Sequence, residues 1–462
     1  MENYDYDLVI IGSGPGGYVS GIRASQLGLK TCVIEKDKTG GVCLNIGCIP
    51  TKALIHQAEL YGNGVEIEKM GIGIEKGGFN YEYVFKKSRK AADMLSKGVQ
   101  YLFKKNNVDL IYGVGRIKSQ NEVLVNDEKL IKAKNILIAT GSRPREIQGF
   151  EFNGINVLSS DDILMMKKLP DSIIILGAGA IGVEFAHIMN RFGVKVYLVE
   201  MLDHMLPTED EEVVQVLARS FRKRRIEVFV KTRAQSMKVN GDKVEVSIVD
   251  ENGNEKLLTA EKLLVVVGRV PNTEGLGLDE VGVNTDKKFI TVGDYYKTTV
   301  DGIFAAGDVV NSPLLAHVAS KEGEIAVEYM AGKESERGIN PDEIPAGVYS
   351  EPQIAGFGYT EERAVKEGVA YKKFVFPYKG AGKAVAIEHS DGMVKIITDE
   401  KGNILGAHIA GTDATELIHE ILLAERAGIS VSTIAETIHA HPTLSEAVME
   451  AARGIEGWAI HV

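Results

Sequence analysis

The most constraining feature of the sequence is a strand, glycine loop, helix and strand unit that occurs twice. The first copy has an apolar strand at 7–11, the loop Gly12-Ser-Gly14-Pro-Gly-Gly17, a helix to Leu27 and a strand ending at Glu35. The second copy has a strand at 172–176, the loop Gly177-Ala-Gly179-Ala-Ile181-Gly182, a helix to Phe192 and a strand ending at Glu200. This internal repeat predicts two related α/β lobes built on parallel sheets.

Each loop has the glycine spacing of a dinucleotide-binding turn. The first glycine permits the tight turn, the second lets a pyrophosphate approach the backbone, and the third lets the helix pack on the strand. The helix N-terminus then attracts the phosphate charge. The acids Glu35 and Glu200 each end the second strand of their unit, where a carboxylate accepts a ribose hydroxyl. A glycine-rich turn without a ligand explains one such loop, but not two with the same flanking elements.

Two loops predict two dinucleotides, a resident flavin in one lobe and an exchangeable nicotinamide in the other. Glu200 accepts the 2′-hydroxyl of NAD and repels the 2′-phosphate of NADP. The residues that follow, Met201-Leu-Asp203, offer no arginine pair for a phosphate. We therefore expect NAD rather than NADP.

A second shared element marks the end of each lobe. The strand at 135–139 runs into Thr140-Gly141-Ser142, and the strand at 262–267 runs into Gly268-Arg269. Beyond 341 the pattern changes to an α+β texture, with strands expected at 384–388 and 393–398 and helices at 416–427 and 445–453. The predicted fold class is therefore α/β, with two dinucleotide-binding domains at 1–149 and 150–270, a central segment at 271–341 and a C-terminal α+β domain at 342–462.

Charge and hydropathy exclude two classes of partner. The net charge is −11, and the longest basic run is Arg222-Lys-Arg-Arg225, so nucleic acid is not an expected partner. No uncharged apolar run reaches the roughly 18 residues of a spanning helix, so we expect no membrane insertion. The acidic first residues lack the basic and apolar parts of a secretory leader, and we expect the chain to stay in the cytoplasm.

Two of the three cysteines form a close pair. Four residues separate Cys43 from Cys48, and Pro50 with the apolar residues after Lys52 predicts that a helix begins just after Cys48. A thiolate at a helix N-terminus is favoured, which makes a cysteine reactive. Half of a zinc site and a pair of inert buried thiols are alternatives, but no second Cys/His pair with metal-ligand spacing lies nearby, and no metal is expected.

The cysteine segment Cys43-Leu-Asn-Ile-Gly-Cys48-Ile-Pro-Thr-Lys52 and the C-terminal segment His439-Ala-His441-Pro-Thr-Leu-Ser-Glu446 resemble the dihydrolipoamide dehydrogenases, within the flavin-dependent pyridine nucleotide–disulfide oxidoreductases. The resemblance runs nearly end to end. It implies an FAD-binding domain at 1–149, an NAD-binding domain at 150–270, a central domain completing the FAD site at 271–341 and a dimerisation domain at 342–462.

The resemblance also implies roles for single residues. Cys43 is the exchange cysteine that faces substrate, Cys48 is the sulfur against the flavin, His441 is the base and Glu446 orients it, whereas His439 is structural. The residues expected to contact FAD are Gly12, Gly14, Gly17, Glu35, Lys52, Gly115, Thr140, Gly141, Ser142, Asp308, Leu314, Leu315, Ala316 and His317. The residues expected to contact NAD are Gly177, Gly179, Ile181, Gly182, Glu184, Glu200 and Gly268.

The expected activity is the oxidation of dihydrolipoamide on a lipoyl protein of a 2-oxoacid dehydrogenase or glycine cleavage complex, with reduction of NAD, in a homodimer. Dithiol attack on a disulfide needs a base near neutral pH, a task that suits histidine. Glutathione reduction is not expected, because arginines are missing after Glu200. Mercuric ion reduction is not expected either, because the chain ends Gly457-Trp-Ala-Ile-His-Val462 without a cysteine pair. A redox sensor or flavoprotein scaffold is a rival of another class.

Overall fold

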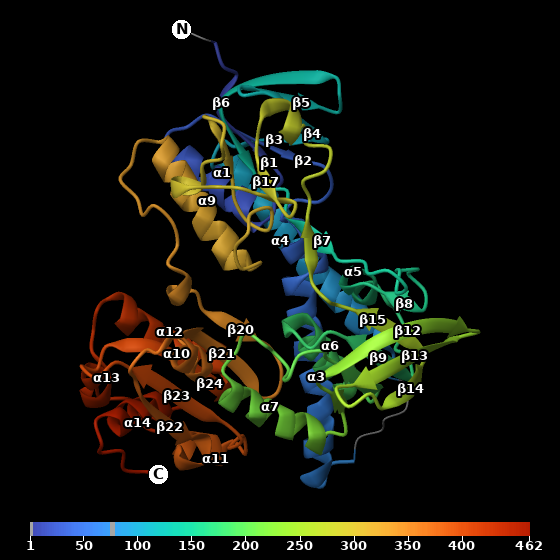
Figure 1. Ribbon diagram of the computed structural model, residues 1–462, viewed down its shortest axis with the longest axis vertical. Coiled ribbons are helices and arrows are strands. Elements are labelled where there is room, and N and C mark those ends of the chain that lie inside the picture. The colour runs from blue at the N-terminus through green and yellow to red at the C-terminus, as the bar shows by residue number, and fades with distance from the viewer. Residues whose placement is uncertain (1–2, 74–78) are drawn as a thin grey trace.

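The first lobe is built on a parallel sheet whose strands come from distant parts of the chain. The computed structural model describes residues 3–73 and 79–462 (Figure 1). Parallel pairing gives the order β3-β2-β1-β6-β19, and β4 and β5 extend the sheet through the other half of β6. These strands are β1 (Tyr6–Ile11), β2 (Thr31–Glu35), β3 (Asp109–Tyr112), β4 (Gly115–Ser119), β5 (Glu122–Val125), β6 (Lys129–Ile138) and β19 (Ile303–Ala305). The central strands are almost wholly buried, as in a sheet covered on both faces.

The segment after the second lobe returns to the first. It supplies β19 to the sheet and the helix α9 (Ala316–Met330), which packs against α1 (Pro15–Gln26). The two helices approach closely because their contact is lined by glycines, and a Cβ added to Gly16 would lie 3.3 Å from the carbonyl oxygen of Ala319. Residues 303–330 therefore complete the lobe that the N-terminus begins. The part of the chain before β19 contains the small elements α8 (Leu278–Val281), β17 (Thr285–Asp286) and β18 (Phe289–Ile290).

The second lobe repeats the strand order of the first over four strands, but its fifth strand comes from the start of the lobe rather than from a later segment. Its parallel sheet has the order β11-β10-β9-β15-β8 and is flanked by α6 (Ala180–Arg191) and α7 (Glu211–Lys223). The strands are β8 (Val157–Leu158), β9 (Ser172–Leu176), β10 (Lys195–Val199), β11 (Glu227–Phe229) and β15 (Lys262–Val265). An antiparallel meander, which the sequence analysis did not identify, is inserted before β15 and consists of β12 (Thr232–Asn240), β13 (Lys243–Asp250) and β14 (Glu255–Ala260).

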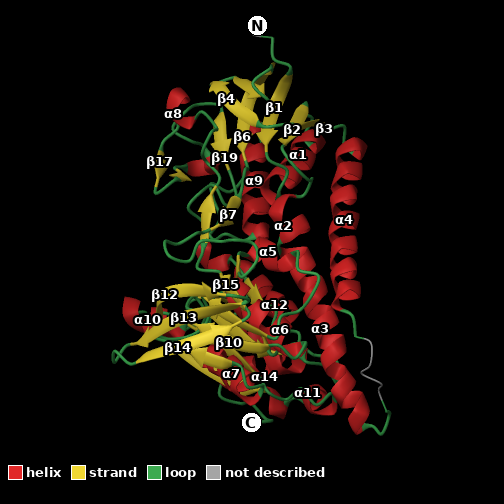
Figure 2. Ribbon diagram, turned by 90° about the vertical axis from the view of Figure 1, so that its right-hand side faces the viewer, coloured by secondary structure: helices red, strands yellow, loops and turns green. Residues whose placement is uncertain are grey.

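The matching loops of the two lobes pair with each other. β7 (Ser142–Pro144) follows β6 in the first lobe, β16 (Arg269–Pro271) follows β15 in the second, and the two form an antiparallel ribbon. The long helices α3 (Cys48–Lys69) and α4 (Tyr81–Lys105) run from the first lobe toward the second along one side of the molecule (Figure 2). The core of the second lobe includes Leu54, Ile55 and Ala58 of α3, so the two lobes share packing.

The C-terminal domain is an antiparallel sheet in the order β20-β21-β24-β23-β22, covered by helices (Figure 1). Its elements are β20 (Ala346–Val348), β21 (Gln353–Gly358), α10 (Glu361–Glu367), β22 (Lys372–Pro377), α11 (Gly382–Ala386), β23 (Met393–Thr398), β24 (Ile404–Gly411), α12 (Ala414–Arg426), α13 (Val431–Glu436) and α14 (Ser445–Ile455). The predicted α/β fold class, with two dinucleotide-binding lobes and a C-terminal α+β domain, is confirmed.

The strand expected at 384–388 is wrong. Residues 382–386 form the short helix α11, with Ala384 buried in the core of the domain. A short apolar alternation does not separate strand from helix, and the two alanines favour the helix.

A buried cation joins the second lobe to the C-terminal domain. Lys395 of β23 is fully buried, and its Nζ lies 2.9 Å from Asp210 Oδ2, 2.9 Å from Glu212 Oε2 and 2.8 Å from Glu361 Oε2. Asp210 also caps α7 by accepting the N–H of Glu212. In the part of the chain that the structure describes, no helix is long and apolar enough to cross a membrane.

Candidate functional site

The two glycine loops have the same backbone geometry. Gly12 and Gly177 take φ values of +102° and +100°, and an added Cβ would overlap the backbone of Ala139 or lie 2.5 Å from the Val266 carbonyl oxygen. A Cβ on Gly17 or Gly182 would likewise overlap the loop's own first carbonyl. Only glycine fits these positions, and the N–H groups at the start of α1 and α6 stay open to a phosphate.

The two acids are also equivalent. Glu35 accepts the backbone N–H of Ser13 at 2.9 Å, and Glu200 accepts that of Ala178 at 2.7 Å. Each carboxylate therefore lies directly beside its glycine loop. The arrangement suits a dinucleotide whose pyrophosphate lies over the loop and whose ribose reaches the acid.

The cysteine pair is brought together by two successive helices. Cys43 lies in α2 (Gly41–Ile46), and Cys48 is the first residue of α3. Gly47 between them permits the close turn, because a Cβ there would lie 2.9 Å from the Val42 carbonyl oxygen. Gly41 lets α2 rest on the first glycine loop, where a Cβ would lie 2.7 Å from the Gly14 Cα. Neither glycine was expected to have a role, although Gly47 lies within the cysteine segment and Gly41 two residues before it.

Cys43 and Cys48 are free thiols in this structure, and their side chains hydrogen bond to each other. The hydrogen bond from Cys43 lowers the pKa of Cys48, and the charge of Lys52 lowers it further against the effect of burial. The same hydrogen bond and burial raise the pKa of Cys43. The pair is therefore electrostatically asymmetric, with the thiolate favoured at Cys48.

Lys52 and Glu184 form an ion pair across the two lobes. Lys52 Nζ lies 2.9 Å from both carboxylate oxygens of Glu184, whose side chain is 6% exposed. The family resemblance implies that Lys52 contacts FAD and Glu184 contacts NAD. The structure shows that they contact each other where the lobes meet, one helical turn from Cys48.

The residues expected at the rest of the flavin site form a hydrogen-bonded group around the β7–β16 ribbon. Ser142 Oγ donates to Asp308 Oδ2 at 2.5 Å, and Arg269 Nε donates to Ser142 Oγ at 2.6 Å. Thr140 Oγ1 donates to the Asn272 carbonyl at 2.7 Å. Gly141 and Gly268 occupy left-handed backbone positions in the two loops.

Three further parts of the expected flavin site lie on β4 and at the start of α9. Gly115 is buried at the start of β4, where a Cβ would lie 3.1 Å from Ile11 Cγ2. Leu314 and Leu315 lead into α9, which begins at Ala316. The next residue, His317, has its Nε2 2.9 Å from the Pro345 carbonyl oxygen. Ile181, which is expected to contact NAD rather than FAD, lies partly buried on α6, one turn before Glu184.

The histidine pair lies on the loop between α13 and α14. His441 Nδ1 lies 3.0 Å from Glu446 Oε1, and the other Glu446 oxygen accepts the N–H of Thr443 at 2.9 Å. Although burial opposes it, these hydrogen bonds hold the pKa of Glu446 below its usual range. The His441 side chain is 75% exposed, whereas both ring nitrogens of His439 are hydrogen bonded, to Glu420 at 2.7 Å and to the Thr437 carbonyl at 2.9 Å.

The single chain does not bring His441 to the thiols. The thiols lie at α2 and the start of α3, whereas His441 precedes α14; Figure 2 shows α2 near the middle of the molecule and α14 in its lower part. The imidazole is exposed and oriented by Glu446, and one of its nitrogens stays free of that contact.

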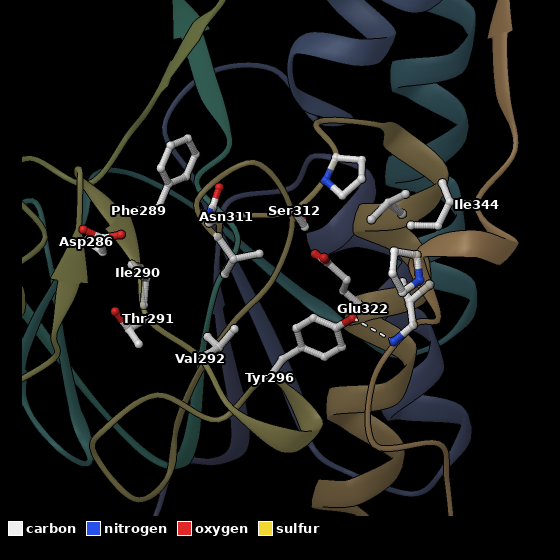
Figure 3. A pocket seen from close by; sticks show the side chains of 15 residues that line it. Asp286, Phe289, Ile290, Thr291, Val292, Tyr296, Asn311, Ser312, Glu322 and Ile344 are labelled. Atoms are coloured by element: carbon white, nitrogen blue, oxygen red, sulfur yellow. Dashed lines mark hydrogen bonds between the residues drawn. The ribbon is translucent and has the colours of Figure 1, made fainter. Parts of the chain in front are cut away.

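A cavity of about 450 Å³ lies beside α9 and was not identified from the sequence (Figure 3). Its walls include Phe289, Ile290 and Ile344, and Figure 3 shows the Glu322 carboxyl pointing into it near Ser312 and Tyr296. Glu322 is 1% exposed and its Oε2 accepts the N–H of Gly307 at 2.6 Å. Burial raises the pKa of Glu322 to about 7. Glu322 therefore supports the turn that presents Asp308.

Comparisons with known proteins agree with this geometry. The family model of the pyridine nucleotide-disulphide oxidoreductases matches residues 6–323, and the model of their dimerisation domain matches residues 344–452. A dihydrolipoyl dehydrogenase of Corynebacterium glutamicum is 42% identical over 99% of both chains, and one of Bacillus subtilis is 40% identical with the same coverage.

Solved structures give the same result. LpdA of Mycobacterium tuberculosis aligns with a TM-score of 0.89 at 28% identity, over 97% of this chain and 99% of that one. The HOCl-induced flavoprotein disulfide reductase RclA of Escherichia coli, solved as a Cu(II) complex, aligns with a TM-score of 0.86 at 25% identity, over 98% of this chain and 99% of that one. The family expected from the cysteine and histidine segments is thus confirmed, and the chain belongs to the pyridine nucleotide-disulphide oxidoreductases.

Proposed function

We propose that the chain is a dihydrolipoamide dehydrogenase, which oxidises the dithiol of a lipoyl group and reduces NAD. The observation that carries the proposal is the asymmetric thiol pair at the start of α3, hydrogen bonded internally and one turn from the Lys52 ammonium. A base held by a carboxylate, His441 with Glu446, stands on the family's dimerisation domain. The dihydrolipoyl dehydrogenases among its relatives match it over nearly their whole length.

The residues present fit both cofactors. FAD suits the first lobe, where the cradle of Gly12, Gly14 and Gly17 lies beside Glu35 and the Asp308 turn completes the far side. NAD suits the second lobe, where Glu200 lies beside the Gly177 loop and no arginine pair follows it. When bound, the flavin supplies a two-electron carrier between the dithiol and the nicotinamide.

The reaction at sulfur follows from the asymmetry of the pair. In the oxidised enzyme Cys43 and Cys48 form a disulfide, and His441 accepts the proton of one substrate thiol. The resulting thiolate attacks the Cys43 sulfur, forms a mixed disulfide and releases Cys48 as the thiolate, which the Lys52 charge favours. The second substrate thiol then attacks its own partner sulfur, closes the lipoamide disulfide and passes its proton to the Cys43 sulfur that it releases. The dithiol of the substrate is thereby oxidised and the Cys43–Cys48 pair is reduced.

Two copies of the chain are needed for this chemistry. We propose a homodimer in which residues 342–462 form most of the interface, and in which His441 of one copy reaches Cys43 of the other. The 75% exposed imidazole of His441 supports this arrangement. The substrate is then the lipoyl arm of a protein from a 2-oxoacid dehydrogenase or glycine cleavage complex.

An anaerobic turnover assay tests the proposal. The purified flavoprotein is given dihydrolipoamide with NAD or with NADP, and in parallel glutathione disulfide with NADPH. We expect rapid NADH formation, kcat/KM for NADP at least about a hundredfold lower because Glu200 repels the 2′-phosphate, and no glutathione reduction. Absence of dihydrolipoamide oxidation in protein that retains its flavin contradicts the proposal and favours a redox sensor or scaffold.

A further inference from the structure

Lys52 lies at a point where three parts of the chain meet. It stands on α3 of the first lobe, and its ion-pair partner Glu184 stands on α6 of the second. The third contact comes from the C-terminal domain. Tyr349, between β20 and β21, places its ring 4.5 Å from Lys52 Nζ, measured to the ring centroid. No role for Tyr349 follows from the cysteine or glycine motifs.

Tyr349 contacts both members of the ion pair. While its ring lies against the Lys52 ammonium, its backbone N–H donates to Glu184 Oε1 at 3.1 Å. A lysine side chain has many rotamers and loses considerable entropy when it is held in one of them. The carboxylate and the ring contact the same ammonium, so together they restrict it to one position. The backbone contact fixes the carboxylate in turn.

The position of this ammonium matters for Cys48. The positive charge of Lys52 lowers the pKa of the Cys48 thiol, whereas the negative charge of Glu184 raises it. Burial opposes the charge on Lys52, yet Glu184 holds the pKa of Lys52 above its usual range. The ammonium therefore stays charged, and its effect on the sulfur depends on where it is held between Glu184 and Cys48.

We propose that Tyr349 is a positioning residue for the redox site: its ring and its backbone N–H hold the Lys52–Glu184 pair so that the ammonium stays beside the Cys48 sulfur. The C-terminal domain thus acts on the thiol chemistry of its own chain through Tyr349. The inference deepens the proposed function and rests on it for its significance. A ring that only covers the apolar stem of Lys52 would stabilise the fold without any effect on Cys48.

Titration of a single thiol separates these two roles. In the flavin-loaded Cys43→Ser protein only Cys48 remains of the pair, and the serine hydroxyl can still donate a hydrogen bond to its thiolate. The Cys48 thiolate is followed by its ultraviolet absorbance against pH, with the Cys43→Ser/Cys48→Ser protein subtracted. Tyr349→Leu and Tyr349→Met, added to Cys43→Ser, remove the ring in two ways. Tyr349→Phe keeps it and is the matched control.

We expect both ring-free variants to shift the Cys48 midpoint upward by about 0.5–1 pH unit, and the phenylalanine variant to stay within about 0.2 unit. A cation–π contact of this kind and one pKa unit correspond to similar free energies. If the effect is purely electrostatic, the thermal unfolding midpoints of the Tyr349 variants equal that of the Cys43→Ser protein. If Tyr349→Leu fails to fold, Tyr349→Met, whose flexible side chain adapts to irregular gaps, decides the question.

A double-mutant cycle shows whether the effect passes through Lys52. With Lys52→Met already present, we expect Tyr349→Met to leave the Cys48 midpoint unchanged. The inference is overturned if the ring-free variants do not move the midpoint, or if they move it equally without Lys52. The titration needs no dihydrolipoamide. If the Cys48 midpoint does not shift although the wild type turns over normally, only the positioning role of Tyr349 is rejected. If the wild type does not oxidise dihydrolipoamide, only the proposed function is rejected.

Discussion

Glu322 shows how one buried carboxyl makes stability depend on pH. Its pKa rises from 4.5 to about 7 because burial disfavours the carboxylate. Between these values the native state binds more protons than the unfolded state, so the free energy of unfolding falls as pH rises from about 4.5 to about 7. The contact with Gly307 needs only an acceptor oxygen, which glutamine also offers.

We therefore expect Glu322→Gln to be more stable than the wild type by about 1–3 kcal/mol at pH 8, where the wild type carries the buried charge, and by little at pH 4.5. Urea unfolding at a series of pH values measures the difference. Glu324→Gln, two residues further along the same helix, is the matched control. Parallel pH profiles for the wild type and Glu322→Gln would contradict the assignment of the raised pKa to this residue.

The two cysteines are predicted to be essential for turnover and dispensable for flavin binding. Cys43→Ser and Cys48→Ser each remove one sulfur of the disulfide, and the glycine cradle of the first lobe lies in other residues. We expect dihydrolipoamide oxidation to fall at least about a thousandfold in each variant, with the flavin absorbance of the purified protein unchanged. Cys32→Ser, at a buried cysteine in β2, is the control and should keep its turnover. Near wild-type rates in either active-pair variant would exclude the disulfide mechanism.

Among single residues, those whose role depends on a short local motif could be predicted from the sequence. Gly12, Gly177, Glu35 and Glu200 are recognisable because turn, helix and acid lie within one short unit. Tyr349 and Glu322 are not recognisable in this way. Their roles depend on contacts with Lys52 and Gly307, which other segments supply.

The strand β23 and the helices α7 and α10 are linked by the charge of Lys395. This ammonium is fully buried and forms ion pairs with Asp210, which is itself fully buried, and with Glu212 and Glu361. Breaking a buried ion pair by removing one partner leaves uncompensated charge and costs about 3–5 kcal/mol. The contact between the second lobe and the C-terminal domain is therefore sensitive to this one side chain.

Lys395→Met is expected to lower the free energy of unfolding by about 3–5 kcal/mol. The only tryptophan, Trp458, lies in the C-terminal domain, so its fluorescence in urea follows that domain directly. Lys256→Met is the matched control, since its pair with Glu227 is exposed on both sides and 3.7 Å long, and it should cost less than about 1 kcal/mol. Equal urea midpoints for the two variants would show that the buried Lys395 cluster stabilises the fold no more than the exposed Lys256–Glu227 pair.

Among the elements, those with strong periodicity or glycine punctuation were predictable. The strands and helices of both repeat units lie within a residue or two of their expected positions, and so do β23, α12 and α14. The segment 384–388 was not predictable, because Ala and Val in a short run suit either state, and Ala384 packs in the core of the domain whereas Val385 is exposed. Which strands pair across long separations, as β7 with β16, is also not a local property.

For the whole molecule the central prediction is that each active site uses two chains. When Cys43→Ser subunits are combined with His441→Gln subunits, one site of the heterodimer carries both lesions and the other carries neither. We expect about half of the wild-type activity in isolated heterodimers, from two homodimers that are each nearly inactive. The dihydrolipoamide assay of differently tagged, purified heterodimers measures it.

A second pairing gives the reverse result. A subunit with both Cys43→Ser and His441→Gln, combined with a wild-type subunit, leaves neither site complete if the base crosses to the partner. If each chain supplies its own base, this heterodimer keeps one working site and the first combination has none. If the base comes from the partner chain, only the first heterodimer is active. If it comes from the same chain, only the second is active.

The return of β19 and α9 to the first lobe sets an order for synthesis. The sheet of the second lobe comes from residues 157–265 alone, and it is complete once that stretch has left the ribosome. The first lobe begins at Tyr6 but lacks its last strand and a covering helix until residue 330 has emerged. At about 5–20 residues per second, the N-terminal half waits several seconds after the second lobe is whole. The lobe that is synthesised first thus completes its fold after the second lobe. Until β19 pairs with it, the edge of β6 is open to pairing with other chains.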